Sequence, residues 1–499
     1  MLNQAPLSRA RSSPSLAMLL LGAAAGVVLA TISLGALATV PQALALAGVT
    51  AAILIAAVCV HPPLGAYLLL LATPLIAGMD RGMAVPLLRP SEALTLLVAL
   101  GVLLNASMRL VTVGVRAPRL RAVDATIVLM AVTGSVLPLL WMLARGNQVT
   151  ADDLQYSLLL WKCYGIYLIF RTAIRTERQV RRCLVLAMVS ASIVGIVAIL
   201  QSLKLFGVPD LLSRYYAPFG EADALKFNRG TSTVASSFAV ADLMVINLGI
   251  AVALLVRGSR HRLVLILALA LFVFGTVASG QFSGVIGLVV GVMALGLITR
   301  RPWRVAAVSV PTAVLAGLLL KPVVDRRLSG FATLSGVPQG WQGRLNNLRT
   351  YFWPQLFSHF HWVLGVRPSA RIDLSITGTQ FVWIESGHTE LLWTGGIPLL
   401  LTFFAFLWVS IRTTAHIARA RTDAFGVAAV ASFASLVVLA VLTTFDPHLT
   451  TRGSSDVLFA LLALACAGGA PSSLRSLRTS DGPAVPRQPD GMYHPSARN

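Results

Sequence analysis

The most conspicuous pattern in the sequence is a series of long apolar runs separated by shorter polar segments. A helix needs about 20 apolar residues to cross the roughly 30 Å hydrocarbon core of a bilayer, and about fourteen runs approach that length. The pattern therefore predicts an all-α polytopic integral membrane protein with about fourteen transmembrane helices. The runs occupy residues 15–36, 42–60, 63–78, 91–107, 123–143, 154–171, 183–203, 236–256, 263–279, 282–299, 304–320, 388–411, 424–444 and 456–470.

Two polar segments, 204–235 and 321–387, are too long to be simple turns. Loops longer than about 12–15 residues are usually functional or disordered. The tail after the last run is rich in Pro, Ser, Arg and Gly, a composition typical of disorder. The predicted organisation is a cytoplasmic N-terminus (1–14), eleven helices (15–320) with an external loop near 204–235, a large extracytoplasmic loop subdomain (321–387), three helices (388–470) and a disordered cytoplasmic tail (471–499).

The composition supports a lipid-embedded chain. Of the 499 residues, 56% are hydrophobic and 12% are charged, whereas soluble domains carry about 25% charged residues. This balance excludes a disordered protein and an ordinary soluble enzyme. The four cysteines lie in or beside apolar runs and form no CxxC pair. Neither a disulfide framework nor a zinc site is therefore expected.

The charge is strongly basic, since 40 Lys and Arg residues against 19 Asp and Glu residues give a net charge of +21. Such a charge can indicate nucleic-acid binding, but the arginines are concentrated in alternate loops, as in the cytoplasmic loops of membrane proteins. Every basic cluster precedes the first run or follows an even-numbered run, which predicts cytoplasmic termini and no nucleic-acid partner. The clusters lie at 9–11, 109–121, 171–182, 257–262, 300–304, 412–421 and 475–478.

The 321–387 segment combines aromatic and basic residues. Its aromatic content argues for an ordered cap rather than a linker, and arginines bind phosphate in a geometry that lysines do not reproduce. We therefore expect an anionic, sugar-bearing ligand at this cap. The alternative is a solvated loop whose amphipathic helices rest on the membrane surface. The aromatic residues include Trp341, Tyr351, Phe352, Trp353, Phe360, Trp362 and Trp383.

Two basic motifs are candidates for binding the phosphate of such a ligand. Arg229 lies in an Asn-Arg-Gly-Thr sequence just before the eighth run. Arg344 follows Gly343 in the large loop, and Arg349 comes five residues later, a spacing that does not give one clean helix face. Arg344 and Arg349 could still point into one cleft, and Arg229 would lie at the outer membrane surface, where it could hold a phosphate. The alternative for Arg229 is an interfacial arginine that extends towards the lipid headgroups.

The sequence Glu-Ser-Gly-His-Thr-Glu at 385–390 is the candidate for proton transfer. Glu385 and His388 are three residues apart, so they share a face of a helix. A carboxylate or an imidazole at a membrane boundary suits a general base, and the sequence leaves both residues open for that role. The alternative is helix capping by Ser386 or Thr389.

Ionisable residues also occur inside the apolar runs, where they are candidates for function by default. Asp242 is close enough to Arg229 in sequence to line the same external cavity. Lys162, in the sixth run, has no partner that the sequence identifies. His359 and His361 form a His-x-His pair, but no third ligand occurs at a recognisable spacing, so no metal site is expected.

These motifs, in this order and on this topology, resemble the O-antigen ligase / O-antigen polymerase (Wzy-type) superfamily of polytopic glycan transferases. The resemblance covers mainly residues 226–400, and the rest of the chain matches only in hydropathy. Two departures occur. Counting back from the glycine of the following helix reaches Glu385 where the family usually has a histidine, and Gln281 stands near the place of a Ser-Arg pair. The matching motifs are Asn228–Thr231, Gly343-Arg344, 364–366, Glu385–Gly387 and 391–397.

The resemblance implies a bacterial cytoplasmic (inner) membrane protein that transfers glycan outside the cytoplasm. The donor would be an oligosaccharide on a polyprenyl diphosphate, the acceptor a hydroxyl of a glycan or a lipid, and no cofactor would be needed. Arg229 and Arg344, with Arg349, would hold the diphosphate, and Glu385 or His388 would take the acceptor proton. Other polysaccharide-assembly proteins are candidate partners.

Three alternatives remain open at this point. A transporter of polysaccharide or of lipid-linked oligosaccharide would show internal repeats and polar groups near the membrane midplane, and the sequence shows no repeat. A glycosyltransferase that uses polyprenyl-phosphate sugars generally carries acidic residues in its first external loop, and the loop at 37–41 has none. A non-catalytic scaffold for cell-envelope assembly is the third.

Overall fold

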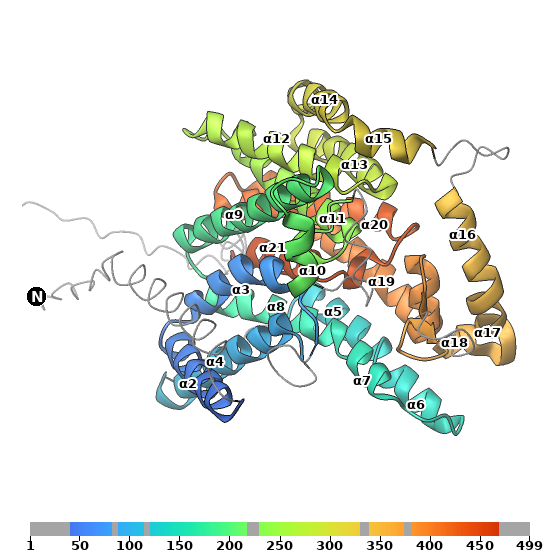
Figure 1. Cartoon of the computed structure of the whole chain (residues 1–499). Coiled ribbons are helices and arrows are strands. Elements are labelled where there is room, and N and C mark those ends of the chain that lie inside the picture. The colour runs from blue at the N-terminus through green and yellow to red at the C-terminus, as the bar shows by residue number, and fades with distance from the viewer. Residues whose placement is uncertain are drawn as a thin grey trace, which may run out of the picture. The chain divides into compact units, whose positions relative to one another are not determined.

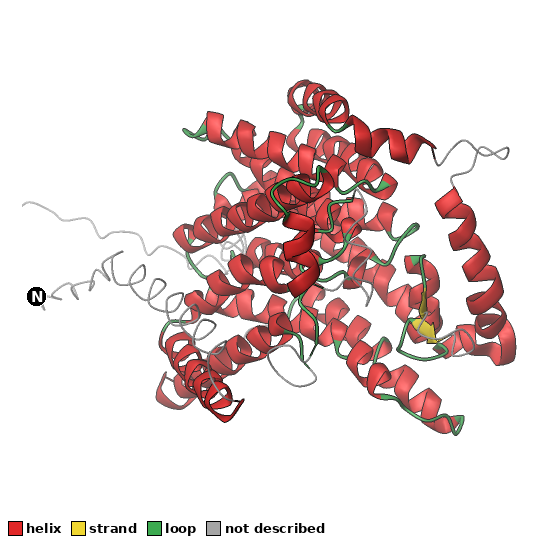
Figure 2. Ribbon diagram, viewed as in Figure 1, coloured by secondary structure: helices red, strands yellow, loops and turns green. Residues whose placement is uncertain are grey.

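The computed structural model describes residues 40–81, 88–113, 120–216, 229–329, 339–373 and 381–468. Helices make up nearly all of this part of the chain, and two short strands form a single hairpin (Figure 2). The predicted all-α class is therefore confirmed in its coarse form. The first apolar run (15–36), the N-terminus (1–14) and the tail (471–499) lie outside the described residues.

The helices of the first half of the chain, coloured blue to green in Figure 1, have bounds that follow the apolar runs closely. Two runs that we predicted as single helices are divided. The run at 123–143 is interrupted at Gly134 and Ser135, where the Ser135 hydroxyl donates to the carbonyl of Ala131. The run at 154–171 is interrupted at Leu158. The helices are α2 (Val40–Val60), α3 (Pro62–Ile76), α4 (Pro90–Val113), α5 (Ala122–Thr133), α6 (Val136–Ala144), α7 (Ala151–Ser157), α8 (Leu159–Ala173), α9 (Glu177–Ser202) and α10 (Val208–Tyr215).

The second half of the chain contains long helices before and after the large loop. The 3₁₀ turn η2 (Ser232–Val234) comes before them, and η6 (His448–Thr450) connects the last two. Each helix matches one predicted run to within a few residues, with the exception of α19, which extends further. They are α11 (Ser237–Val256), α12 (Arg262–Ala278), α13 (Phe282–Thr299), α14 (Pro302–Leu319), α19 (Gly387–Ala420), α20 (Ala424–Leu442) and α21 (Ser454–Ala467).

Eight of the described helical segments are long and apolar enough to cross a membrane, and four shorter ones are apolar as well. The outer helices expose large apolar side chains, among them Leu263 and Trp303, which are 70% and 84% exposed. Large exposed apolar surfaces are rare on soluble proteins and mark faces that contact lipid or protein. These features are those of a membrane protein.

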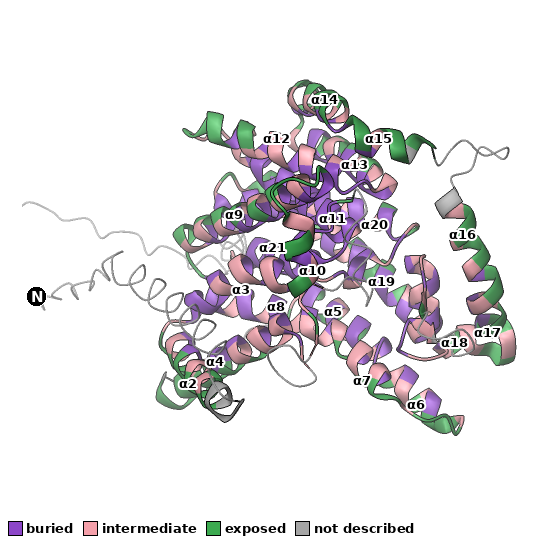
Figure 3. Ribbon diagram, in the orientation of Figure 1, coloured by how far each residue is buried: buried purple, intermediate pink, exposed green. Residues whose placement is uncertain are grey.

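The core of the helical bundle lies around α11, α20 and α21, where buried residues predominate (Figure 3). Every residue from Ser454 to Cys466 in α21 is buried. Small side chains allow the helices to approach closely, as transmembrane helices do. For example, a Cβ atom on Gly249 of α11 would lie 3.3 Å from the Cα atom of Ala431 in α20.

Helix α19 is broken at Gly396, whose φ of +66° is strained for any residue other than glycine. Pro398 follows, and proline cannot donate the hydrogen bond that would continue the helix. The rings of His388 and Phe404 lie 5.9 Å apart, whereas a continuous helix would separate them by about 24 Å at 1.5 Å per residue. The segment before Gly396 therefore folds back against the segment after it, and the predicted single helix over 388–411 is wrong in this respect.

The 321–387 segment contains short helices and the hairpin. An apolar cluster that includes Phe352, Leu356 and Ile384 packs against Trp393 of α19. In the hairpin, Arg371 lies opposite Trp383. The elements are α15 (Lys321–Leu328), α16 (Gln339–Asn347), the π-helical η4 (Leu348–Phe352), α17 (Trp353–Phe357), the 3₁₀ turn η5 (Ser358–Phe360), α18 (His361–Leu364), β1 (Arg371–Asp373) and β2 (Phe381–Trp383).

Two ion pairs fasten this segment to α7. The guanidinium of Arg367 contacts Asp153, with Nη2 2.6 Å from Oδ2 and Nε 2.9 Å from Oδ1. Asp153 is fully buried and also accepts from the backbone N–H of Ser369. Arg371 pairs with Asp152. A buried carboxylate with this many donors fixes the position of the chain that supplies them.

Candidate functional site

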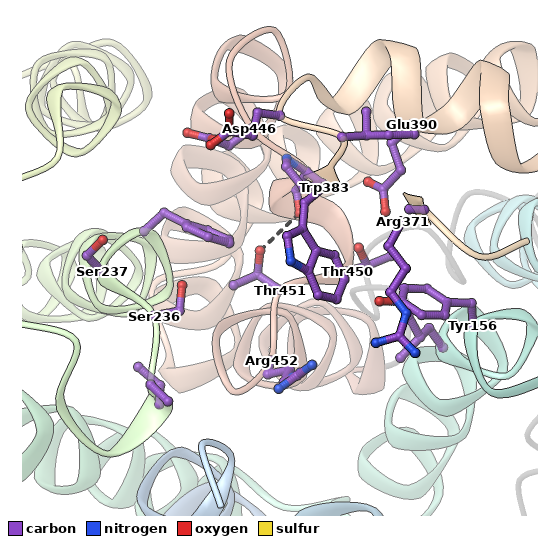
Figure 4. Close-up of a pocket in the computed structure, with 18 of the residues that line it drawn as sticks. Tyr156, Ser236, Ser237, Arg371, Trp383, Glu390, Asp446, Thr450, Thr451 and Arg452 are labelled. Atoms are coloured by element: carbon purple, nitrogen blue, oxygen red, sulfur yellow. Dashed lines mark hydrogen bonds between the residues drawn. The ribbon is translucent and has the colours of Figure 1, made fainter. Parts of the chain in front are cut away.

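A cavity of about 420 Å³ lies where the 229–238 segment, the large loop, α7 and the α20–α21 connection meet. Its size is typical of a small-molecule site. Figure 4 shows Trp383 in the middle of the lining, with Asp446 and Glu390 on one side and Arg452 on the other. Six arginines and four carboxylates line it: Arg81, Arg89, Arg229, Arg344, Arg371, Arg452, Asp152, Glu385, Glu390 and Asp446.

Arg344 connects two of these carboxylates. Its Nη1 atom lies 2.9 Å from Oδ1 of Asp446, and its Nε atom lies 3.5 Å from Oε1 of Glu385. Asp446 is 2% exposed, and its second oxygen accepts from the Ser283 hydroxyl at 3.4 Å. Because one end of the guanidinium is held by a buried carboxylate, the group has a fixed orientation in the cavity.

A close contact between helices places Glu385 near Asp446. Ser386 caps α19 by accepting from the backbone N–H of Thr389. Gly387 then lies so close to the end of α20 that a Cβ atom would be 2.6 Å from the carbonyl oxygen of Thr443. Only glycine fits at this approach. The capping alternative and the functional interpretation of this motif are therefore compatible.

Arg229 is held in place by its neighbours in the chain. The backbone N–H of Gly230 donates to the carbonyl of Ala278, and a Cβ atom on Gly230 would lie 2.7 Å from the carbonyl oxygen of Ala198. Within the described part of the chain, Arg229 forms no ion pair within 4 Å. Partial desolvation and the guanidinium of Arg344 lower the pKa of Arg229. Two guanidinium groups that line the same cavity favour an anion between them.

Glu385 has a suitable environment for accepting a proton. Burial raises its pKa above the ordinary glutamate value, although the nearby guanidinium of Arg344 acts in the opposite direction. A carboxylate with a raised pKa is a stronger base than an ordinary exposed carboxylate. A general base is most effective when its pKa lies near the operating pH, so the raised pKa suits Glu385 to this role. Its side chain retains 37% exposure, so it is accessible to a ligand in the cavity.

The structure brings Arg229, Arg344 and Glu385 together but leaves the other three predicted residues outside this cavity. Arg349 is exposed on the π-helical η4 and does not line the cavity. The imidazole of His388 packs on Phe404 and does not line the cavity.

Asp242 lines a smaller cavity within the bundle. Its carboxylate lies 2.8 Å from Nδ1 of His448. His448 Nε2 is buried without a hydrogen-bond partner. The backbone N–H of His448 donates to the carbonyl of Asp446, which pairs with Arg344. Asp242 is thus connected to the Arg344–Asp446 pair through His448 and not through the main cavity.

Several lining residues were not predicted from the sequence. Asp446 and Arg452 lie in the short connection between α20 and α21, where a polar sequence between two apolar runs was the available signal. Arg89 directly precedes α4, in a connection without a recognisable motif. Gln281 also lines the cavity and donates to the Ser237 hydroxyl at 2.8 Å. It stands near the place where the resembled family has an arginine.

No group of three or more His, Cys, Asp or Glu side chains that could hold a metal ion occurs among the described residues. His359 and His361 have ring centroids 5.9 Å apart in the large loop. Comparison with protein-family models gives no match, and no curated protein matches the chain.

Proposed function

We propose that the protein is a cell-envelope polysaccharide polymerase or ligase that transfers glycan from a polyprenyl-diphosphate donor to an acceptor hydroxyl outside the cytoplasm. The observation that carries the proposal is the grouping of Arg229, Arg344 and Glu385 in one cavity. These residues come from three distant parts of the chain, and the sequence motifs that contain them resemble those of the O-antigen ligase and polymerase superfamily. The lipid-facing helices provide a surface for the polyprenyl tail.

The chemistry follows from the arrangement of charges. The acceptor hydroxyl oxygen attacks the anomeric carbon of the donor sugar, and the bond between that carbon and the phosphate oxygen breaks. The leaving diphosphate retains the electron pair, and Arg229 and Arg344 stabilise its negative charge. Glu385 takes the proton of the hydroxyl. Between the two candidate bases, the lining of the cavity favours Glu385 over His388.

The test is the glycan profile of cells that lack the protein and are complemented with single variants. We expect Arg344→Ala and Glu385→Gln each to abolish the polymer or its transfer, since removing one preorganised charge partner typically costs about 10²–10³ in rate. His388→Ala serves as the matched control, because its ring lies outside the cavity, and it should restore the wild-type profile. Loss of polymer in His388→Ala but not in Glu385→Gln would reverse the assignment of the base.

The profile also separates polymerase from ligase. Single repeat units that accumulate on the carrier indicate a polymerase, and long polymer that stays on the carrier indicates a ligase. An unchanged glycan in all of these strains would overturn the proposal.

A transporter is the second candidate, and one contact favours it. Lys162 in α8 pairs with Asp456 in α21 at 2.9 Å, and both side chains are largely buried between apolar helices. Ionisable pairs at such positions often mark transport paths. A transporter that uses this pair should lose function in Asp456→Asn and should tolerate Glu385→Gln, whereas the proposed transferase requires Glu385.

A further inference from the structure

The second cationic end of the cavity, around Arg89, has a different character from the Arg229–Arg344 end. Arg89 is 8% exposed, and its Nε atom is buried without a hydrogen-bond partner. Its guanidinium lines the main cavity and a small side cavity beside it. A buried guanidinium with an unpaired N–H group is costly. It is expected where a ligand supplies the missing acceptor.

The surroundings of Arg89 do not neutralise it. Glu92 accepts from the backbone N–H of Arg89 at 3.1 Å, and its other oxygen pairs with Arg81 at 3.3 Å. Glu92 therefore serves the cap of α4 and a second arginine. Among the described residues, no carboxylate oxygen lies within 4 Å of the Arg89 guanidinium nitrogens. The amino end of α4, at Pro90, adds its partial positive charge at the same place.

The two cationic ends are separate from each other. Burial and the neighbouring guanidinium of Arg81 lower the pKa of Arg89 to about 10, which leaves it cationic at neutral pH. Arg89 also lines the small side cavity, to which neither Arg229 nor Arg344 contributes.

We propose that the Arg89 end binds a phosphate or diphosphate group carried by the acceptor, so that the protein acts on two phosphorylated lipids at once. The inference rests on the proposed transferase function, because it assigns the Arg229–Arg344 end to the donor. A polyprenyl-diphosphate acceptor and a phosphorylated glycolipid share the chemistry that Arg89 recognises. An acceptor substrate without a phosphate would leave the Arg89 guanidinium without a hydrogen-bond acceptor.

The experiment counts bound diphosphates on the full-length protein in nanodiscs, with undecaprenyl diphosphate as the probe and native mass spectrometry as the readout. We expect two equivalents on the wild type, and one each on Arg89→Gln and Arg229→Gln. Arg214→Gln is the matched control, because this exposed arginine on α10 lies outside the cavity, and it should bind two. A wild type that binds one equivalent, or an Arg89→Gln variant that still binds two, would overturn the inference.

The melting temperature of the same samples separates a ligand-binding role from a structural one. If Arg89 only supported the fold, Arg89→Gln would lower the Tm of the ligand-free protein. We expect instead an unchanged or higher Tm, since the variant removes an incompletely paired buried charge, together with a loss of at least tenfold in affinity for the second equivalent. A lowered Tm with retained binding would contradict the proposal.

The source of the phosphate is distinguished by the probe that fills the second position. Undecaprenyl diphosphate as the second equivalent indicates a lipid-linked acceptor, and a phosphorylated core glycolipid that binds there instead indicates a glycolipid acceptor. Equal binding of the dephosphorylated glycolipid would overturn the inference. Two bound diphosphates without any glycosyl transfer would reject the proposed function but support the Arg89 binding site. Glycosyl transfer with only one bound equivalent would support the proposed function but reject the Arg89 binding site.

Discussion

Glu385 and Arg344 lie 3.5 Å apart in a cavity that is partly closed to solvent. Burial raises the pKa of Glu385, and a general base must be deprotonated to act. We therefore expect the transfer rate to fall as the pH decreases through a value above the ordinary glutamate pKa of about 4.3. The measurement is the pH dependence of glycan transfer by the purified protein with a lipid-linked donor.

The matched control for this pH profile is Glu385→Gln. This variant keeps the size of the side chain but cannot accept the proton, so its residual rate should show no acid limb. An acid limb that persists in Glu385→Gln would show that another group is the base.

Asp242 and His448 form a buried pair outside the main cavity, with side chains that are 10% and 2% exposed. Burial opposes the charged imidazolium, but the carboxylate of Asp242 outweighs it and raises the pKa of His448. The stabilisation is therefore complete below the unfolded-state pKa of about 6.5 and is lost as the pH rises through the folded-state pKa. Breaking a buried pair by removing one partner typically costs about 3–5 kcal/mol, so we expect Asp242→Asn to lower the Tm substantially at pH 6.

The difference in Tm between the wild type and Asp242→Asn should shrink as the pH increases. Asp210→Asn, at an exposed position of α10, controls for the loss of a carboxylate and should leave the Tm unchanged at every pH. A difference that stays constant between pH 6 and pH 9 would mean that the pair contributes as a neutral hydrogen bond.

At the scale of elements, the fold-back of α19 at Gly396 positions the start of that helix beside the site. A Cβ atom on Gly396 would lie 2.3 Å from the carbonyl oxygen of Val363, and its φ of +66° adds strain of about 1–3 kcal/mol for another residue. We expect Gly396→Ala to lower the Tm by several degrees and to reduce transfer, because α18 and the start of α19 move apart. Gly317→Ala in α14 has open space around it and should be neutral or slightly stabilising.

Much of the element order could be predicted from hydropathy, because apolar runs of sufficient length form helices wherever they occur. The run at 236–256 became α11 almost residue for residue. The fold-back at Gly396 could not be predicted, since Gly-Gly-Ile-Pro signals a break but not its direction. The direction depends on contacts with α18, which lies elsewhere in the chain.

The candidate site was predictable only where a residue belonged to a recognisable motif. Arg229, Arg344 and Glu385 were identified in this way, and the structure groups them. Asp446 and Arg89 lie in short connections that resemble ordinary turns in the sequence. Their importance depends on which helix ends meet, a tertiary property that local sequence does not carry.

At the scale of the whole molecule, the proposed function requires the cavity to face the side of the membrane that holds the flipped donor. The exposed arginines at 257–262 and 300–304 lie in connections that the positive-inside rule assigns to the cytoplasm. A cysteine introduced at Arg260 should therefore be protected from a membrane-impermeant maleimide in intact cells. A cysteine at Gln355, exposed on α17 of the large loop, should be labelled.

The native cysteines offer little background, since three are buried and Cys59 is half-buried; a Cys59→Ser parent removes the last accessible thiol. Both positions should be labelled once the membrane is permeabilised, which controls for local accessibility. Labelling of Arg260→Cys and protection of Gln355→Cys in intact cells would place the large loop in the cytoplasm. Nucleotide-activated sugars rather than flipped lipid-linked ones would then be the available donors, and the proposed function would fail for the whole molecule even if every residue of the cavity were correctly identified.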